Sequence, residues 1–293
     1  MTALATFLEQ GLTRRNQRRG FAKLVLLLFL VYFMLPIFWL IVSSTKSDSQ
    51  LFSTFGLWFA HFDLLQNLHQ VFTYEGGIYL TWLGNTALYA VTAGVGAAVF
   101  STMAGYAFAK YRFRGRGVLF AVVLGSIMIP QTALVIPIYL LLSQVGIINT
   151  PFAVILPSLV SPIGVFLMRV YAERAVPDAL LDAARVDGAG EFRIFRSVSF
   201  RILVPGFATV LLLSFVATWN NYFLPLVVLS TPKYYPLTVG LAQWNSSSSA
   251  GGGANVLFSV VIAGALVAVI PVAIAFLLLQ RYWQGGLTAG GVK

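Results

Sequence analysis

Long apolar runs alternate with polar segments along most of the 293-residue chain. Each run has about 20 residues or more, the length that an α-helix needs to cross a hydrocarbon core about 30 Å thick. We therefore expect an all-α, polytopic membrane protein with six transmembrane helices. The predicted spans are 21–43, 81–109, 118–142, 151–170, 202–229 and 254–280.

These spans divide the chain into three regions. We expect a cytoplasmic N-terminal segment at 1–20, a transmembrane domain at 21–280 and a cytoplasmic tail at 281–293. The polar segment 171–201 interrupts the transmembrane domain. No convincing small-residue cleavage site follows the first apolar run, so we interpret that run as a retained span rather than a signal peptide.

Composition and charge support this membrane assignment. Hydrophobic residues make up 58% of the chain and charged residues only 10%, whereas a soluble domain carries about a quarter charged residues. The net charge of +10 does not indicate nucleic-acid binding, because the basic residues cluster in alternate loops, as the positive-inside rule requires of cytoplasmic segments. Both termini are therefore expected to be cytoplasmic. The cytoplasmic set is Arg14, Arg15, Arg18, Arg19, Lys23, Lys110, Arg112, Arg114, Arg116, Arg169, Arg174, Arg185, Arg193, Arg196, Arg201, Arg281 and Lys293, with only Lys46 and Lys233 in the other loops.

The residue types that the chain lacks narrow its chemistry. None of the six spans has an ionisable residue near its centre, which argues against a proton-coupled carrier. The glycine-rich tail lacks the Gly-Lys-Ser/Thr pattern of a phosphate-binding loop, so any driving ATP is expected on another chain. There is no cysteine, and His61 and His69 lie in an external loop. No metal site is therefore expected.

The polar segment after residue 176 predicts a helix–turn–helix at the membrane surface. Pro177 suits the first turn of a helix, and Gly188 with Gly190 suits its end. Asp178, Asp182 and Arg185 share one face by their spacing of three and four residues, while Ala179, Ala183 and Val186 project from another side. Next comes an apolar arc of helical period, opposite Arg193, Arg196 and Ser197. Its members are Phe192, Ile194, Phe195, Val198 and Ile202. A solvated loop with an interfacial helix is the alternative interpretation.

This segment resembles a known motif. Asp182-Ala183-Ala184, followed after three residues by Gly188, is similar to the EAA loop of ABC-importer permeases, in the form found in the carbohydrate-uptake branch. Other parts of the chain resemble the same family in the same order. They are Asn85-Thr86 at the second span, Trp219-Asn220 and the residues to Leu226 in the fifth, and segments 235–241 and 286–293, which are similar to the G-type, maltose-permease-like subunit.

The resemblance implies a type I ABC-importer permease fold in a bacterial or archaeal plasma membrane. It also implies a second permease subunit in a heterodimer, two cytosolic ATPase subunits that bind ATP and Mg, and an extracytoplasmic solute-binding protein. In this family the polar helix pair docks on the ATPase, Asp182 meeting a basic group and Gly188 permitting the tight turn. The implied docking residues are Asp178, Asp182, Ala183, Ala184, Arg185, Asp187, Gly188 and Phe192, and the implied tail contacts are Leu287, Thr288, Gly290 and Gly291.

Two positions depart from the family's pattern. Asp182 replaces the usual glutamate, which keeps the charge but shortens the side chain. Arg201 stands where the pattern has proline, and Pro205 follows four residues later. Because Arg201 does not interrupt a helix, we expect the second helix of the pair to continue further toward the membrane than in relatives.

The solute is the least defined part of this interpretation. Aromatic and amide side chains suited to a sugar occur at the third and fifth spans, although they serve equally well as contacts between helices. The Ser/Gly-rich segment 246–254 is either a contact for the binding protein or a flexible connector. We expect a di- or oligosaccharide, with a permease for glycerol phosphate or polyamine, or a secondary carrier, as alternatives. The candidate solute-path residues are Gln131, Thr132, Trp219, Asn220, Asn221 and Tyr222.

Overall fold

The computed structural model describes residues 2–250 and 257–288, and in these ranges the regular structure is entirely helical. Short 3₁₀ segments and one π segment connect the α-helices. The α-helices are α1 (Thr2–Ser44), α2 (Asp48–Ser53), α3 (Leu64–Thr73), α4 (Ile78–Lys110), α5 (Arg116–Ile127), α6 (Val135–Val145), α7 (Pro151–Ser158), α8 (Pro162–Ala175), α9 (Asp178–Val186), α10 (Glu191–Ile194), α11 (Phe200–Trp219), α12 (Phe223–Val228), α13 (Leu237–Ala250) and α14 (Phe258–Thr288). The 3₁₀ segments are η1 (Tyr74–Gly77), η2 (Gln131–Leu134) and η4 (Pro232–Tyr234), and η3 (Phe195–Ser199) is the π segment.

Local sequence explains where several helices begin and end. Pro151 and Pro162 each occupy the first turn of a helix, where a missing N–H costs nothing. The Ser161 hydroxyl accepts a hydrogen bond from the Gly164 amide at 3.1 Å and so caps α8. At the end of α6, Gly146 adopts a φ of 74°, a conformation that glycine reaches without strain.

Five helical segments are long and apolar enough to cross a membrane, and the bent pair α5 and α6 gives a sixth if it is taken as one span. This agrees with the predicted all-α polytopic fold. The five segments are Ala22–Ser44, Leu64–Lys110, Pro151–Ala175, Glu191–Trp219 and Phe258–Tyr282.

Two predicted spans differ from the structure. The run at 118–142 is not one straight helix, because α5 and α6 meet at 101° across a short break. Pro130, which has no N–H to continue the helix, lies in that break. The fifth span was predicted to reach residue 229, but α11 ends at Trp219. There the Asn220 side chain donates to the Val216 carbonyl at 2.9 Å, which satisfies the last turn and lets the chain leave the helix.

The segment that follows η4 is helical rather than a loop. Helix α13 includes the serine run from Ser246 to Ser249, in which each hydroxyl donates to a carbonyl four residues earlier, at 2.9 to 3.0 Å. This local bonding keeps the serines within the helix. Residues 251–254 of the candidate contact segment lie outside the described residues.

One end of the bundle is held together by aromatic side chains. Trp82 is buried against Trp244, with ring centroids 4.8 Å apart, and its indole N–H donates to the Pro232 carbonyl at 2.9 Å. The hydroxyl of Tyr79 donates to the Gly264 carbonyl of α14 at 2.7 Å. Buried Tyr and Trp side chains commonly donate their O–H or N–H to backbone acceptors. Here these bonds and the ring contact join α4, α13 and α14.

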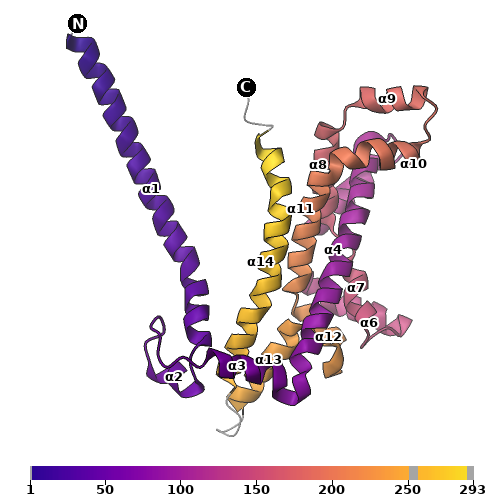
Figure 1. The fold of residues 1–293 in the computed structure, drawn as a ribbon. Helices are drawn as coiled ribbons and strands as arrows, with labels where there is room; N and C mark the ends of the chain where they lie inside the picture. Colours follow the sequence, from indigo (N-terminus) through magenta and orange to yellow (C-terminus); the bar gives the residue numbers. More distant parts are fainter. Residues whose placement is uncertain (1, 251–256, 289–293) are drawn as a thin grey trace.

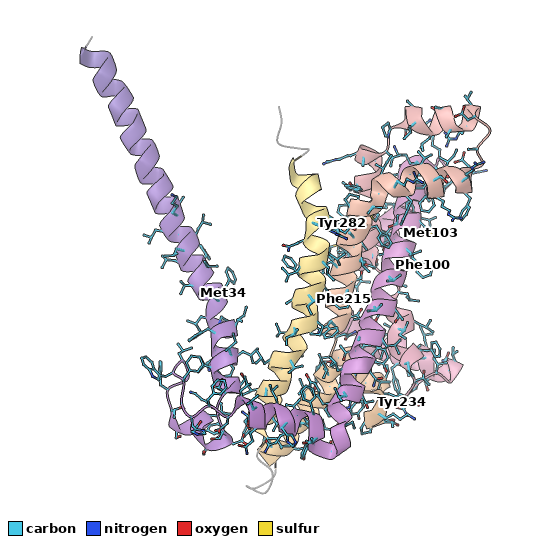
Figure 2. All side chains as sticks on the ribbon, in the orientation of Figure 1. Met34, Phe100, Met103, Phe215, Tyr234 and Tyr282 are labelled. Carbon is cyan, nitrogen blue, oxygen red and sulfur yellow. The ribbon has the colours of Figure 1, made fainter. Side chains whose placement is uncertain are left out.

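Helices α4, α8, α11 and α14 pack into a bundle, while α1 stands apart from it along most of its length (Figure 1). Only 6% of the apolar window of α1 is buried. Figure 2 shows Met34 on this separated helix, and Phe100 and Met103 on α4; all three side chains are exposed. Large exposed apolar surfaces of this kind are expected where lipid or another subunit covers the protein.

Helices α9 and α10 project from the end of the bundle where α14 also ends (Figure 1). The core beneath them is formed by Tyr106, Met168, Leu181, Ile194 and Leu203. Because these side chains come from α4, α8, α9, α10 and α11, one cluster connects the projecting pair to three helices of the bundle.

Candidate functional site

The predicted helix–turn–helix is present as α9 and α10. Pro177 was predicted in the first turn of the helix. In the structure it is the N-cap residue, and helix α9 begins at the next residue, Asp178. It ends in a Schellman motif: the Gly188 amide donates to the Arg185 carbonyl at 2.9 Å, and the Ala189 amide donates to the Ala184 carbonyl at 3.0 Å. Gly188 has a φ of 79°, so a side chain there would strain the turn.

One side of α9 is fastened to the bundle. Leu181 is only 2% exposed within the core cluster. At the start of the helix, Lys110 Nζ lies 2.7 Å from Asp178 Oδ1. The hydrogen bond from Lys110 and its positive charge lower the pKa of Asp178 below the ordinary value. The lysine side chain is almost fully buried while the carboxylate is largely exposed, so the pair lies at the edge of the bundle.

Arg185 connects the two helices of the pair. Its Nη1 donates to Asp182 Oδ1 at 2.8 Å, and its Nε donates to Glu191 Oε1 at 2.8 Å. Tyr111, just after α4, donates its hydroxyl to Glu191 Oε2 at 2.9 Å. Hydrogen bonds from Arg185 to these carboxylates raise the pKa of the guanidinium, while burial and the bond to Glu191 raise the pKa of Tyr111. These contacts fix the turn relative to α4.

The predicted docking residues divide between two sides of α9. Asp182, Ala183 and Asp187 are exposed, and Val186 is 88% exposed. Ala184 instead packs partly against the core. The exposed side therefore combines two acidic groups with small and apolar side chains, a surface that a protein partner can approach closely.

Phe192 does not lie in the predicted apolar arc. It is 72% exposed, whereas Ile194 is fully buried. At about 100° per residue, positions two apart in a helix point to nearly opposite sides. Phe192 therefore belongs to the exposed surface, and only Ile194, Phe195, Val198 and Ile202 turn toward the protein.

The second helix runs without a break into the membrane span, and Arg201 lies inside the continuous helix. Helix α10, the π segment η3 and α11 follow one another directly from Glu191 to Trp219. Ser199 in η3 donates to the Tyr106 hydroxyl at 3.1 Å. Pro205 lies inside α11. A π segment interrupts regular packing within a continuous helix, and here it joins the projecting pair to the span.

Some candidate solute-path residues hold helices together. Trp219 is buried, and its indole N–H donates to the Ala268 carbonyl of α14 at 3.2 Å. The carbonyl of Asn221 accepts a hydrogen bond from Thr238 of α13 at 2.7 Å. The side chain of Asn220 donates to a carbonyl of α11. Trp219 and the Asn221 carbonyl therefore connect α11 and the segment after it to α14 and α13, whereas Asn220 is exposed and bonds only within its own helix.

The other candidate solute-path residues are exposed. Gln131 and Thr132 occupy η2, at the bend between α5 and α6. Tyr222 is 41% exposed. In the described part of the chain, no hydrogen bond connects Gln131 or Thr132 with residues 219–222.

The predicted tail contacts lie at the limit of the described chain. Leu287 and Thr288 form the end of α14, and Gly290 and Gly291 lie outside the described residues. Within residues 2–250 and 257–288, no group of three or more His, Cys, Asp or Glu side chains is placed to hold a metal ion.

The apolar helical bundle with its projecting polar helix pair is the fold of a multi-pass membrane protein. Residues 97–285 match the family described as binding-protein-dependent transport system inner membrane component. The chain belongs to this family of ABC-importer permeases.

Sequence relatives extend over most of the chain. It is 39% identical over 229 residues to the arabinooligosaccharides transport system permease protein of Halalkalibacterium halodurans, covering 78% of this chain and 79% of the relative. The corresponding protein of Bacillus subtilis is 36% identical over 273 residues, covering 92% and 93%. A lactose transport system permease protein of Rhizobium radiobacter is 31% identical over 261 residues, covering 88% and 90%.

A solved structure shares the fold. It is described as a crystal structure of a bacterial ABC transporter involved in the import of the acidic polysaccharide alginate. The match has a TM-score of 0.77 and 25% sequence identity, and it covers 92% of this chain and 98% of that chain. The type I importer permease fold is thereby confirmed.

Proposed function

We propose that this chain is the permease subunit of an ATP-driven, binding-protein-dependent importer of a di- or oligosaccharide. It works with a second permease in a heterodimer. Two cytosolic ATPase subunits bind ATP and Mg and couple to the chain through residues 178–200. An extracytoplasmic binding protein delivers the solute.

The geometry of α9 and α10 is the observation that carries this proposal. Leu181 and the Lys110–Asp178 pair hold the inner side of α9 on the bundle. The outer side presents Asp182, Ala183 and Val186. A helix fixed on one side and bare on the other can transmit a partner's movement, because a push on α9 reaches α4, α8 and α11 through the shared core.

Continuity between α10 and α11 supports the same mechanism. The helical path from Glu191 to Trp219 is uninterrupted, so displacement of the projecting pair moves the fifth span directly. At its far end α11 contacts α14 through Trp219. Closure of the ATPase pair would therefore tilt α11 and α14 together and change the access of the solute path.

The names of the relatives support a sugar as the solute. Those named for arabinooligosaccharides and lactose cover at least 78% of this chain. Because the Trp219 side chain and the Asn221 carbonyl contact other helices, we assign the solute-facing role in this chain to the exposed residues Gln131, Thr132, Asn220 and Tyr222. Single changes at these exposed positions should alter specificity only slightly if the partner permease supplies most contacts.

The test is ATPase stimulation in the complete complex reconstituted with its binding protein and scanned over candidate sugars. We expect stimulation by one di- or oligosaccharide and little by glycerol phosphate or a polyamine. Stimulation by either of the latter alone would refute the sugar assignment. Solute accumulation that persists without ATP would refute the importer mechanism itself.

A further inference from the structure

A basic pocket lies on the α10–η3 segment and reaches the first turn of α11. It has a volume of about 380 Å³ and is lined by Phe192, Arg193, Arg196, Ser197 and Arg201. This volume falls within the range of about 300 to 1,000 Å³ that is typical of small-ligand sites. Three of its five lining residues are arginines.

The positive charge of this pocket has no ion-pair partner in the part of the chain that the structure describes. Among the described residues, no ion pair or hydrogen bond engages the guanidinium groups of Arg193, Arg196 and Arg201. The nearest acidic residue in the sequence, Glu191, is occupied by Arg185 and Tyr111. Three adjacent uncompensated arginines attract an anion, and their planar donors suit the oxygen atoms of phosphate.

The length of the fifth span allows the pocket to lie at the depth of lipid headgroups. The continuous segment Glu191–Trp219 has 29 residues, and α11 alone has 20. At about 1.5 Å per residue, α11 is sufficient to cross a core of about 30 Å. We infer that α11 crosses the core and that the residues before Phe200 lie at the boundary between membrane and water; Figure 1 shows α10 beside this end of the bundle.

We propose that this pocket binds the phosphate of an anionic phospholipid from the cytoplasmic leaflet. Arg193, Arg196 and Arg201 hold the phosphate oxygens, and the Ser197 hydroxyl donates to the headgroup. The cytoplasmic placement rests on the proposed function, whereas the pocket's charge and shape do not.

A lipid in this position would brace the joint between the projecting helix pair and the span. The pocket residues extend over the π segment and the first turn of α11. An anion that bridges Arg193 with Arg201 fixes the ends of this joint relative to each other. The helix would then bend less at the π segment when α10 moves, and more of that movement would reach α11. ATP-driven uptake should therefore depend on anionic lipid.

The test measures retention of phosphatidylglycerol by the full chain purified in mild detergent, using native mass spectrometry with phosphatidylcholine as the neutral comparison. We expect the R193Q/R196Q/R201Q variant to bind phosphatidylglycerol roughly 100-fold more weakly, from three lost charges near a membrane surface. The matched control is R112Q/R114Q/R116Q, which removes three charges after α4, and it should bind as the wild type does. R193K/R196K/R201K keeps the three positive charges and should keep most of the binding. This result would show that the glutamine variant loses lipid through its lost charges and not through unfolding.

Three results would overturn the proposal. Equal loss of lipid in both glutamine variants would mean that only net charge matters. Displacement of phosphatidylglycerol by inorganic phosphate at low millimolar concentration would identify a free-phosphate site instead. Unchanged lipid binding with loss of ATPase association in R193Q/R196Q/R201Q would make the pocket a protein contact. Lipid binding in detergent does not depend on sugar or ATP. If the proposed function is wrong, the uptake assay fails while lipid binding is unchanged; if the lipid proposal is wrong, lipid binding fails while uptake is unchanged.

Discussion

Gly188 and Gly190 lie in the same turn, and each has open space where a Cβ atom would be placed. They differ in backbone conformation: φ is 79° at Gly188 and −69° at Gly190. A left-handed conformation costs a residue with a side chain about 1–2 kcal/mol. We therefore expect Gly188→Val to reduce copurification of the ATPase subunits and ATP-driven uptake severalfold or more.

Gly190→Val is the matched control for this change, because it adds the same side chain at an unstrained position. It should retain most of the uptake of the wild type. If Gly188→Val keeps full uptake, or if both variants fail equally, the conformation of the turn is not what coupling requires.

The Lys110–Asp178 pair predicts a pH dependence. Hydrogen bonding to Lys110 lowers the pKa of Asp178 in the folded state. A lowered folded pKa contributes stability that is fully present above the ordinary carboxyl pKa and is lost as the pH falls through the lowered value. Lys110→Met should therefore lower the thermal midpoint of the purified protein at neutral pH. The difference should disappear in acid below the lowered pKa of Asp178; a pH-independent difference would mean that the ion pair does not contribute.

At the residue scale, spacing within α9 predicted some contacts and could not reveal others. Asp182 and Arg185 are three residues apart, and their ion pair follows from helix geometry. The partners Lys110 and Tyr111 are 68 and 80 residues from Asp178 and Glu191. Only the folded bundle brings them together, so no local pattern could identify them.

At the element scale, the close approach of α4 and α8 depends on Gly105. A Cβ atom there would lie 2.5 Å from the Cβ of Met168 and 2.7 Å from the backbone nitrogen of Arg169. Since a backbone atom cannot swing aside, Gly105→Ala should force the helices apart and destabilise the protein by about 1–3 kcal/mol. Thermal unfolding in detergent measures this.

Gly125→Ala in α5 provides the control, because no atom lies within 4 Å of the position that its Cβ would take. Alanine favours helix over glycine by about 1 kcal/mol, so this variant should be unchanged or slightly more stable. A Gly105→Ala protein as stable as Gly125→Ala would show that α4 and α8 can separate freely.

The elements themselves were predicted well where apolar runs are uninterrupted and poorly where they change direction. Hydropathy cannot distinguish one span from two helices at 101°, because both α5 and α6 are apolar. The break around Pro130 carried a signal, but proline is also tolerated inside helices, as Pro205 is in α11. Similarly, the exit of the chain after Trp219 depends on Asn220 and on contacts with α13 and α14, which lie later in the sequence.

At the scale of the whole molecule, the membrane topology can be tested cleanly because the chain has no cysteine. The positive-inside rule places Arg114 in the cytoplasm and Ser246 on the opposite side. A membrane-impermeant maleimide added outside intact cells should label Ser246→Cys and leave Arg114→Cys unlabelled until the cells are lysed. The reverse pattern would contradict the proposal that α9 and α10 lie in the cytoplasm.

The two ends of the bundle have different roles in this account. Aromatic contacts of Trp82 and Trp244 fix one end, while the other end carries a projecting pair with an exposed outer side. Family membership establishes the permease, and the geometry supports coupling at α9. In the assembled importer, we propose, an ATPase subunit covers this exposed side.

The most direct measurement is photo-cross-linking from a benzophenone amino acid in place of Val186, which is 88% exposed on α9. The same group in place of Val122, 64% exposed on α5, is the control. We predict a covalent adduct between the permease and the ATPase subunit from position 186 and none from position 122. An importer that is active but yields no ATPase adduct from position 186, or yields equal adducts from both positions, would contradict the account.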